Sequence, residues 1–522
     1  MISIDQLRPS LKPYDSYPIH YLLDNTSRQS PEKTAIIDEE KSFSYQEIRE
    51  ATLKLGTALT SIGVSKGDRV GILSPNCAEF VISFYGIARI GAIVTTINSG
   101  YRELEISHQI NDSGCSLLIV HSDLAPTLEK ALALSHVKPT IITLGSKDSD
   151  FWNLIDAASP MESEIKIDPD SDLAALPYSS GTTGLSKGVM LSHFNLVSNV
   201  QQLVALTGKA KLMHDDMVLV HLPLFHIYGM NVLMNGCIAV GATQVMMGRF
   251  NMVDFLDLIQ NTRINKLFSV PPVGLALTQF PTLSDWDISS LELSLFGAAP
   301  LSPELQIKIS EVLKCCVIQG YGMTETSPLT NADFSETGFT KPGSIGPATA
   351  DTEQKIVDVD NPQLILPADT PGELMIRGPQ VMLGYYNNLE ATSETLTEDG
   401  WIHTGDIASM DAEGYVWILD RKKELIKYKG FQVPPAELEG LLLQHPDITD
   451  AAVIGKEDKD SGEIPKAYVV KLPDSTLSGD DVMDFISGKV ATYKEIRDVE
   501  FIDEVPKNPS GKILRRILRD NI

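Results

Sequence analysis

The stretch YSSGTTGLSKG, residues 178–188, combines three glycines with several serine and threonine hydroxyls and one lysine. Closely spaced backbone N–H groups and hydroxyls allow a chain to fold around phosphate oxygens, and Lys187 adds positive charge. The pattern is not a Walker A motif, because Ser186 precedes the lysine and Gly188 follows it. A flexible surface loop is the alternative interpretation, but the length and regularity of the stretch favour a phosphate-binding loop.

Two other stretches are strongly basic, although the formal net charge of the chain is -26. Residues 421–429 carry five basic groups against one glutamate, and residues 507–519 carry five with no acidic residue. Such stretches indicate a local anionic ligand, with a solvated surface as the alternative. The overall acidity opposes nonspecific binding to nucleic acid or to anionic lipid, so neither is expected as a partner.

The residues that could do chemistry belong to a globular chain of 522 residues, which is long enough for two or more domains. The longest apolar run, about Phe80 to Val94, contains Arg89 and is too short to span a membrane, so it predicts a buried helix. The first residues lack an apolar run behind a basic segment, which predicts no secretory signal and a cytoplasmic protein. The five cysteines form no CxxC pair, so neither disulfides nor a zinc site is expected.

The pattern of apolar residues predicts an α/β arrangement up to about residue 410. Ser44 and Glu47 have capping-box spacing at the start of a helix that ends near Gly63. A short buried strand and another helix follow, and this alternation is typical of a largely parallel sheet. Strands are also expected on both sides of the glycine-rich stretch, which makes residues 179–187 a loop between them.

The last hundred residues have a different pattern, in which short helices and strands predict a compact α+β unit. The expected fold is therefore α/β, with a large N-terminal domain of mixed sheets and packed helices, residues 1–419, and a small α+β C-terminal domain, residues 424–522. Residues 420–423 are expected to form the hinge between these two domains.

Several further motifs stand in a fixed order and identify a family. With YSSGTTGLSKGVMLSH they resemble the motifs of the adenylate-forming superfamily, which includes acyl-CoA synthetases, 4-coumarate:CoA ligases, beetle luciferases and peptide-synthetase adenylation domains. The resemblance covers the chain from about residue 25 to its end. The motifs, in chain order, are LPLFHIYG, QGYGMTETSP, GELMIRG, WIHTGD, DRKKELIKYKGFQVPPAELE and PKNPSGKILRR.

The resemblance implies an ATP-dependent, AMP-forming acyl-CoA ligase. Such an enzyme joins a carboxylate to the α-phosphate of ATP, expels pyrophosphate, and passes the acyl group from the acyl-adenylate to the thiol of CoA. Lys512 resembles the lysine that bridges the carboxylate and the α-phosphate, so the C-terminal domain is implied to be a mobile lid that turns about Lys423. CoA and Mg²⁺ are the other implied cofactors, and Glu325 is the implied protein contact to the metal.

The same resemblance assigns the remaining site residues. Thr183 and Lys187 would act on the β and γ phosphates, within a loop shaped by Ser179, Ser180, Gly181, Thr182 and Gly184. The residues implied to contact the nucleotide are Gln319, Gly320 and Tyr321 at adenine, Thr324 at the α-phosphate, Asp406 and Arg421 at ribose, and Lys427 and Gln432 at the adenylate. Those implied for CoA are Lys429, Gly430 and Arg249.

The acid would lie beside His226, which is implied to gate the path between the two steps. Tyr228 would line the acid pocket, and Gly297 and Ala298 would form the opposing wall. Overall similarity is greatest to 4-coumarate:CoA ligase-like enzymes, while FHIYGMNVLMN is also similar to medium- and long-chain fatty acyl-CoA synthetases. The substrate is therefore an aromatic acrylic acid or a fatty acid.

Three other functions are alternatives at this stage. An adenylation enzyme that loads a separate carrier protein and a luciferase-like oxygenase both need the same acyl-adenylate, so the motifs for that step do not separate them. A nucleotide-binding regulatory protein without catalysis would be expected to lack Lys187, Glu325, Asp406 or Lys512, and all four are present.

Overall fold

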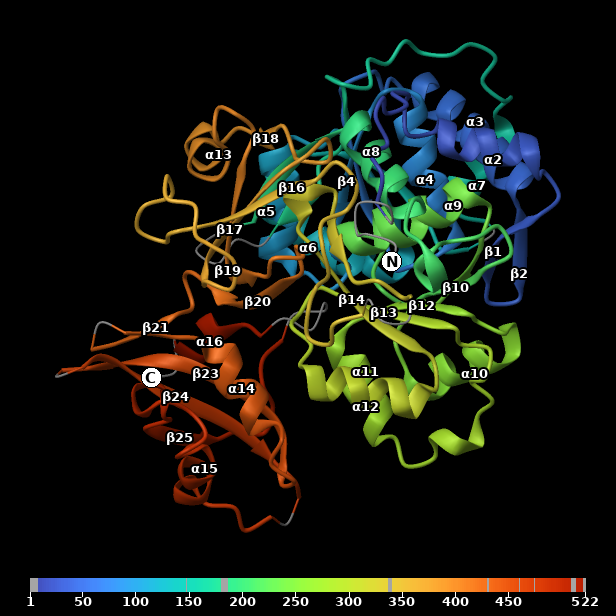
Figure 1. The fold of residues 1–522 in the computed structure, drawn as a ribbon. Helices are drawn as coiled ribbons and strands as arrows, with labels where there is room; N and C mark the ends of the chain where they lie inside the picture. Colours follow the sequence, from blue (N-terminus) through green and yellow to red (C-terminus); the bar gives the residue numbers. More distant parts are fainter. Residues whose placement is uncertain are drawn as a thin grey trace.

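The structure is a computed structural model, and Figure 1 shows a large α/β part with a smaller C-terminal unit, coloured orange to red, beside it. No helix among the described residues is long and apolar enough to cross a membrane. The large part contains three sheets and the C-terminal unit a fourth, within the part of the chain that is described. The described residues are 8–146, 148–179, 186–336, 340–429, 431–459, 461–473, 475–507 and 513–519.

The first sheet has parallel pairing through its middle and antiparallel strands at both edges. Helices α10 (Met252–Thr262), α11 (Pro271–Gln279) and α12 (Pro303–Leu313) contribute to a separate hydrophobic core on this sheet. The strands, in sheet order, are β15 (Leu329–Ala332), β14 (Cys316–Gly322), β13 (Leu293–Phe296), β12 (Lys266–Ser269), β10 (Met217–Val220), β11 (Thr243–Met246), β1 (Thr34–Asp38) and β2 (Lys41–Ser44).

The second sheet carries the strands on both sides of the glycine-rich stretch. Strands β8 and β9 pair antiparallel, with Tyr178 opposite Gly188, which confirms that the stretch connects two strands. Helices α5 (Glu103–Ser113) and α6 (Ala125–Leu134) pack on this sheet around another core cluster. The strands in order are β18 (Gly384–Tyr385), β9 (Lys187–Ser192), β7 (Leu173–Ala175), β4 (Ile93–Ile97), β3 (Arg69–Leu73), β5 (Leu117–His121) and β6 (Thr140–Leu144), with β8 (Tyr178–Ser179) beside β9.

Helices between these two sheets form the largest core. The predicted capping box is confirmed, because the Ser44 side chain accepts a hydrogen bond from the N–H of Glu47 and the Glu47 side chain accepts one from the N–H of Ser44. The other helices near this core are α2 (Tyr21–Gln29), α3 (Tyr45–Ser61), α4 (Ala78–Arg89), α7 (Asp150–Ala157), α8 (His193–Val204) and α9 (Gly236–Val240).

The predicted buried helix from Phe80 to Val94 is only partly right. Helix α4 is buried at every residue and contacts β1, β3 and β4, but it ends at Arg89. Gly91 then adopts φ +69°, a conformation that glycine takes without strain, and β4 begins at Ile93. The charge of Arg89 is paired inside the core with Asp24 at 2.7 Å, so the helix can stay buried around it.

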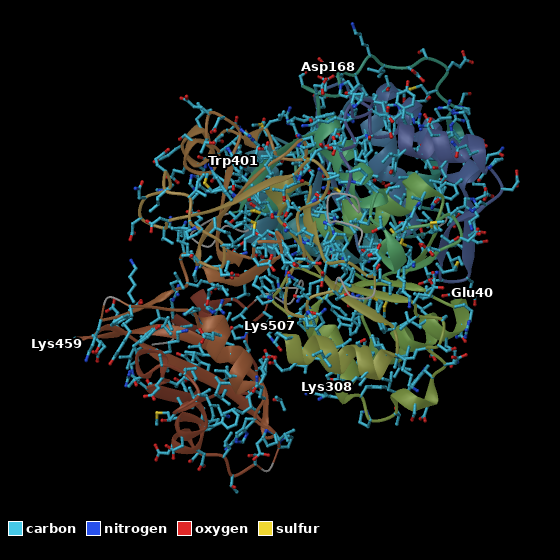
Figure 2. All side chains as sticks on the ribbon, in the orientation of Figure 1. Glu40, Asp168, Lys308, Trp401, Lys459 and Lys507 are labelled. Carbon is cyan, nitrogen blue, oxygen red and sulfur yellow. The ribbon has the colours of Figure 1, made fainter. Side chains whose placement is uncertain are left out.

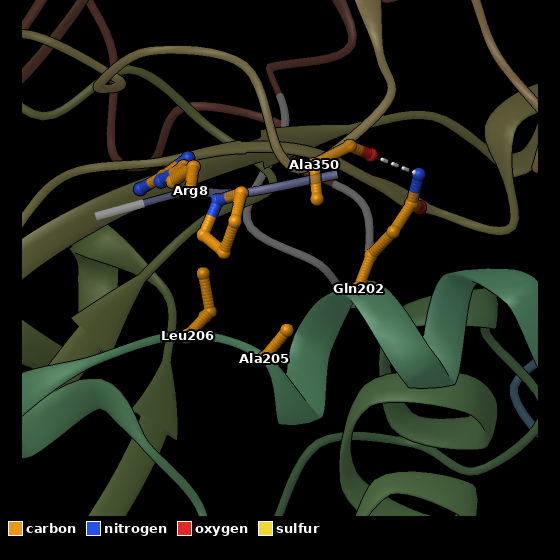
Figure 3. A pocket seen from close by; sticks show the side chains of 6 residues that line it. Arg8, Gln202, Ala205, Leu206 and Ala350 are labelled. Carbon is orange, nitrogen blue, oxygen red and sulfur yellow. Dashed lines mark hydrogen bonds between the residues drawn. The ribbon is translucent and has the colours of Figure 1, made fainter. Parts of the chain in front are cut away.

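The N-terminal segment and the third sheet complete the large part. The Arg8 guanidinium donates to the carbonyl oxygens of Pro347 and Ala348, and Gln202 on α8 donates to the carbonyl oxygen of Ala350. Figure 3 shows the small pocket between this segment and α8, whose volume of about 10 Å³ is at the lower limit for holding one water molecule. The third sheet comprises β16 (Glu353–Val357), β17 (Gly372–Arg377), β19 (Ile402–Met410) and β20 (Val416–Arg421), with α13 (Leu389–Thr395) beside β18 and β19.

The C-terminal unit is the α+β arrangement that the sequence predicts. The chain leaves the third sheet after Arg421 and enters the C-terminal sheet at Ile426. This unit has its own hydrophobic core, built from its strands and from α14 and α15. Its elements are β21 (Ile426–Tyr428), β22 (Phe431–Val433), α14 (Pro435–Leu442), β23 (Ile448–Asp458), β24 (Gly462–Lys471), α15 (Gly479–Ile486), β25 (Asp498–Phe501) and α16 (Arg515–Arg519).

Candidate active site

A cleft of about 2300 Å³ is lined by both the large part and the C-terminal unit, and it gathers most of the predicted site residues. They come from strand ends and connections of all three sheets of the large part, which explains how motifs far apart in the sequence meet. The predicted residues that line the cleft are Ser179, Lys187, His226, Tyr228, Gly297, Ala298, Gln319, Gly320, Tyr321, Thr324, Glu325, Asp406, Arg421 and Lys423.

Several predicted residues are not placed in this cleft. Arg249 is exposed after β11 and does not line the cleft, and Lys427 and Lys429 are exposed on the hairpin of β21 and β22. Ser180, Gly181, Thr182, Thr183, Gly184, Gly430, Lys512 and the side chain of Gln432 lie outside the described residues.

The first corner of the cleft is formed by Tyr321, Asp406 and Arg421. Asp406 on β19 is opposite Arg421 on β20, and the Arg421 Nε lies 3.4 Å from Asp406 Oδ1. The Tyr321 hydroxyl donates to Asp406 Oδ2, and burial together with this carboxylate raises the pKa of Tyr321, so it remains a donor. A carboxylate has about four acceptor positions, so Asp406 can still accept hydrogen bonds from two vicinal hydroxyls.

The second corner is formed by Glu325, whose carboxylate is buried. Its Oε1 accepts hydrogen bonds from Ser179 Oγ at 3.0 Å and from the Tyr385 hydroxyl at 2.8 Å. These two bonds hold the carboxylate in one orientation. Among the described residues no cluster of three metal-binding side chains exists. A single oriented carboxylate fits Mg²⁺, which is typically held by one or two carboxylates together with phosphate oxygens and water.

Both ends of the glycine-rich loop are held by one helix. The Tyr178 hydroxyl, on β8 before the loop, donates to Asp112 Oδ2 at 2.6 Å, and His108 Nε2 lies 2.9 Å from the carbonyl oxygen of Ser186, the last residue before β9. His108 and Asp112 are four residues apart on α5, so they lie on the same face of that helix. After the loop, the Lys187 ammonium lies 5.0 Å from the centre of the Tyr385 ring. We name the pair His108 and Asp112 the α5 clamp.

The third corner is apolar and lies around Tyr228, the first residue of a π-helix (Tyr228–Asn235). The Tyr228 hydroxyl donates to the carbonyl oxygen of Leu295 at 3.2 Å, which fixes the ring. A Cβ on Gly297 would lie 3.4 Å from this ring, so the Gly297 backbone packs close to Tyr228 instead of forming the predicted opposing wall. Ala298 adopts φ +68°, a conformation that costs about 1 kcal/mol or more for a residue with a side chain.

His226 lines the cleft two residues before Tyr228. Its Nδ1 accepts a hydrogen bond from the N–H of Tyr228 at 3.3 Å. A neutral imidazole in this arrangement carries its proton on Nε2 and can donate from that atom.

The predicted catalytic Lys512 lies outside the described residues, but the segments on both sides of it are described. Lys507 and Ile513 form an isolated antiparallel bridge, and both line the cleft. Lys507 is paired with Asp450 on β23 at 2.6 Å, and Figure 2 shows it where the C-terminal unit meets the large part.

The sequence did not predict Tyr385, His108 or Asp112. The spacing of His108 and Asp112 on a helix was the available signal, but their partners lie 78 and 66 residues away in the sequence, respectively.

Comparisons with known proteins agree with this geometry. Residues 23–386 match the family model described as AMP-binding enzyme, and residues 437–512 match that of its C-terminal domain. A 4-coumarate–CoA ligase of Pinus taeda is 39% identical over 98% of this chain and 96% of the relative.

Solved structures give the same result. MatB of Rhodopseudomonas palustris is 29% identical over 97% of this chain and 99% of its own, with a TM-score of 0.90 for its ATP-bound form and 0.79 for its apo form. The anthranilate CoA ligase AuaEII, solved with anthranoyl-AMP, is 28% identical over 97% of both chains, with a TM-score of 0.90.

The chain therefore belongs to the AMP-binding enzyme family. Within that family it is an acyl-CoA ligase, an acid–thiol ligase that uses ATP, CoA and Mg²⁺.

Proposed function

We propose that the acid activated by this ligase is a planar aromatic acid of the 4-coumarate type. The observation that carries this proposal is the near-complete alignment with a relative named 4-coumarate–CoA ligase. The geometry supports it, because the fixed ring of Tyr228 and the side-chain-free backbone at Gly297 line the same apolar corner of the cleft, where they offer a flat surface to a ring. The resemblance to fatty acyl-CoA synthetases keeps a straight-chain acid as the competing possibility.

The site residues then have separate roles in the first step, acyl-adenylate formation. Lys187 and the glycine-rich loop hold the phosphates, and Asp406 with Arg421 holds the ribose. When bound at Glu325, Mg²⁺ spreads the negative charge of the leaving pyrophosphate. Lys512 neutralises the repulsion between the attacking carboxylate and the α-phosphate, which is the main electrostatic barrier to this step.

The C-terminal unit is proposed to be the lid, residues 424–522, with the hinge at residues 420–423 and Lys423 as its pivot. The better agreement with ATP-bound MatB than with apo MatB supports the view that this lid lies in the arrangement used with ATP. Lys507 and Ile513, the described residues on either side of Lys512, form a β-bridge with each other and line the cleft, which supports the same view. A turn of the lid would then let the thiol of CoA approach.

The test is CoA-dependent AMP release over a panel of cinnamates, benzoates and fatty acids from short to long. We expect kcat/KM for 4-coumarate to exceed that for any fatty acid by at least about tenfold, the size of effect that a fitted apolar pocket gives. A higher value for a fatty acid would contradict the proposed substrate. Replacing CoA with a phosphopantetheinylated carrier protein tests the carrier-loading alternative.

Gly297→Ala is the matched variant for this panel. Its added methyl group would lie 3.2 Å from the carbonyl oxygen of Gly320 and 3.4 Å from the Tyr228 ring. It should therefore lower kcat/KM more for acids with a ring than for straight-chain acids. An equal loss for both classes would mean that the acid ring does not lie at Gly297.

A further inference from the structure

Helix α14 of the lid begins without a capping side chain from the lid. Its first residues are Pro434 at the N-cap and Pro435 at the first helical position, and neither has a backbone N–H. The first N–H that the helix offers is that of Ala436. It donates to Asp420 Oδ2 at 2.9 Å, so the helix is capped by a residue of β20 in the large part.

Asp420 is a buried carboxylate, with 4% of its surface exposed. Besides Ala436, the N–H of Arg421 donates to it, at 2.7 Å to Oδ1. Burial raises the pKa of Asp420 to about 7, and the two N–H groups and the Arg515 guanidinium oppose that rise. Burying a carboxylate costs free energy, so a role in the position of the helix explains this residue better than a role in stability alone.

Helix α14 is itself tied firmly to the lid. One turn after Ala436, both oxygens of Glu439 accept hydrogen bonds from the Arg515 guanidinium, at 2.7 and 2.8 Å. Glu439 also accepts the N–H of Val453 on β23 at 2.7 Å, and the Arg515 guanidinium also donates to Glu424. Because these bonds lie within the lid, α14 moves with it.

The hydrogen bond from Ala436 to Asp420 therefore joins the start of the proposed hinge to the lid, across the pivot at Lys423. Asp420 precedes Lys423 in the chain and stays with β20, whereas Ala436 follows Lys423 and turns with the lid. A rotation about Lys423 must separate the two atoms, so this bond exists in one lid arrangement and is lost in the other.

We propose that Asp420 is a positioning residue that holds the lid in the arrangement for the first step, acyl-adenylate formation. The inference rests on the proposed hinge and lid. It assigns to Asp420 no contact with ATP or the acid: the residue acts through the start of α14, and its bond must break before the thiol step.

The experiment measures the two half-reactions separately in the full-length enzyme. The first is pyrophosphate–ATP exchange with the best acid of the panel, and the second is AMP release when CoA is added to the isolated acyl-adenylate. Asp420→Ala removes both acceptor oxygens. Asp420→Asn keeps the shape of the side chain but has only one acceptor oxygen. We expect kcat of exchange to fall about tenfold in Asp420→Ala and less in Asp420→Asn, because a hydrogen bond to a charged acceptor is lost. The CoA step should be unchanged or faster.

Ser478→Ala is the matched control, since Ser478 caps α15 within the lid by accepting the N–H of Asp481 at 3.3 Å. It should leave both half-reactions unchanged. The proposal is overturned if Asp420→Ala lowers both half-reactions by the same factor, if it lowers neither, or if it raises only KM for ATP, which would assign the effect to Arg421. If wild-type enzyme shows no exchange with any acid, the proposed function itself fails, which is a separate outcome.

Discussion

Replacing Asp112 with alanine should impair ATP use although Asp112 contacts neither ATP nor the acid in the proposed site. The change removes the acceptor of the Tyr178 hydroxyl, which lies 2.6 Å from the carboxylate. Burial and the Asp112 carboxylate raise the pKa of Tyr178, so the phenol remains a donor at working pH. Hydrogen bonds to a charged partner contribute about 1.5–3 kcal/mol, and roughly 1.4 kcal/mol is a factor of ten. Because both groups are half-buried, we expect the lower end of this range, which is about a tenfold loss of kcat/KM for ATP.

The assay is pyrophosphate–ATP exchange at varied ATP and saturating acid. The kcat/KM for ATP should fall about tenfold in Asp112→Ala and in Tyr178→Phe, and the double variant should be no worse than either, because both remove one interaction. KM for the acid should stay within about twofold. Asn111→Ala is the control, since Asn111 on the same helix accepts hydrogen bonds from Ser135 and His136 rather than holding the loop. Additive losses in the double variant would refute the α5 clamp.

Two further predictions concern catalysis and stability. Lys512→Ala should abolish adenylate formation, a loss of at least about a hundredfold, while ATP binding measured by calorimetry stays largely in place; persistent exchange would contradict the catalytic assignment. Burial raises the pKa of Asp333 to about 7 from an ordinary value of 3.8, so the folded protein keeps a proton that the unfolded chain releases near pH 4. The wild type should therefore lose stability relative to Asp333→Asn as pH rises from about 4 to 7, by as much as about 4 kcal/mol. Urea unfolding of both proteins at pH 5 and pH 8 measures this, and a difference independent of pH would argue against it.

Local patterns predicted the elements well because their causes are local. The capping box at Ser44 satisfies N–H groups three residues away, and the pattern of α3 follows from its own buried face. The glycine-rich stretch connects two strands as expected, since small polar residues separate two apolar runs, but the predicted loop bounds, 179–187, include Ser179 and Lys187, which belong to the strands. The prediction of one helix from Phe80 to Val94 was only partly right, because a helix and a strand that are both buried on all sides have the same composition. Only Gly91 marks the break between them.

Contacts between distant parts of the chain could not be predicted in this way. Arg89 is paired with Asp24, 65 residues away, and nothing in the apolar run around it indicates that partner. The α5 clamp depends likewise on a fold that brings α5 to both ends of a loop. The resemblance to a family assigns residues that touch ligands, and it therefore omitted His108 and Asp112, which act on the loop instead.

The end of β20 connects the nucleotide site to the lid through two neighbouring residues. Successive residues of a strand point to opposite sides. Arg421 lies beside Asp406 at the proposed ribose site, whereas Asp420 faces the start of α14. A nucleotide that fixes Asp406 and Arg421 also fixes the backbone of β20 next to Asp420, since Asp406 and Arg421 are register partners in the same sheet. Binding of ATP should then favour the docked lid without any direct contact between ATP and α14, and Asp420→Ala should weaken this coupling while leaving the Arg421 contact in place.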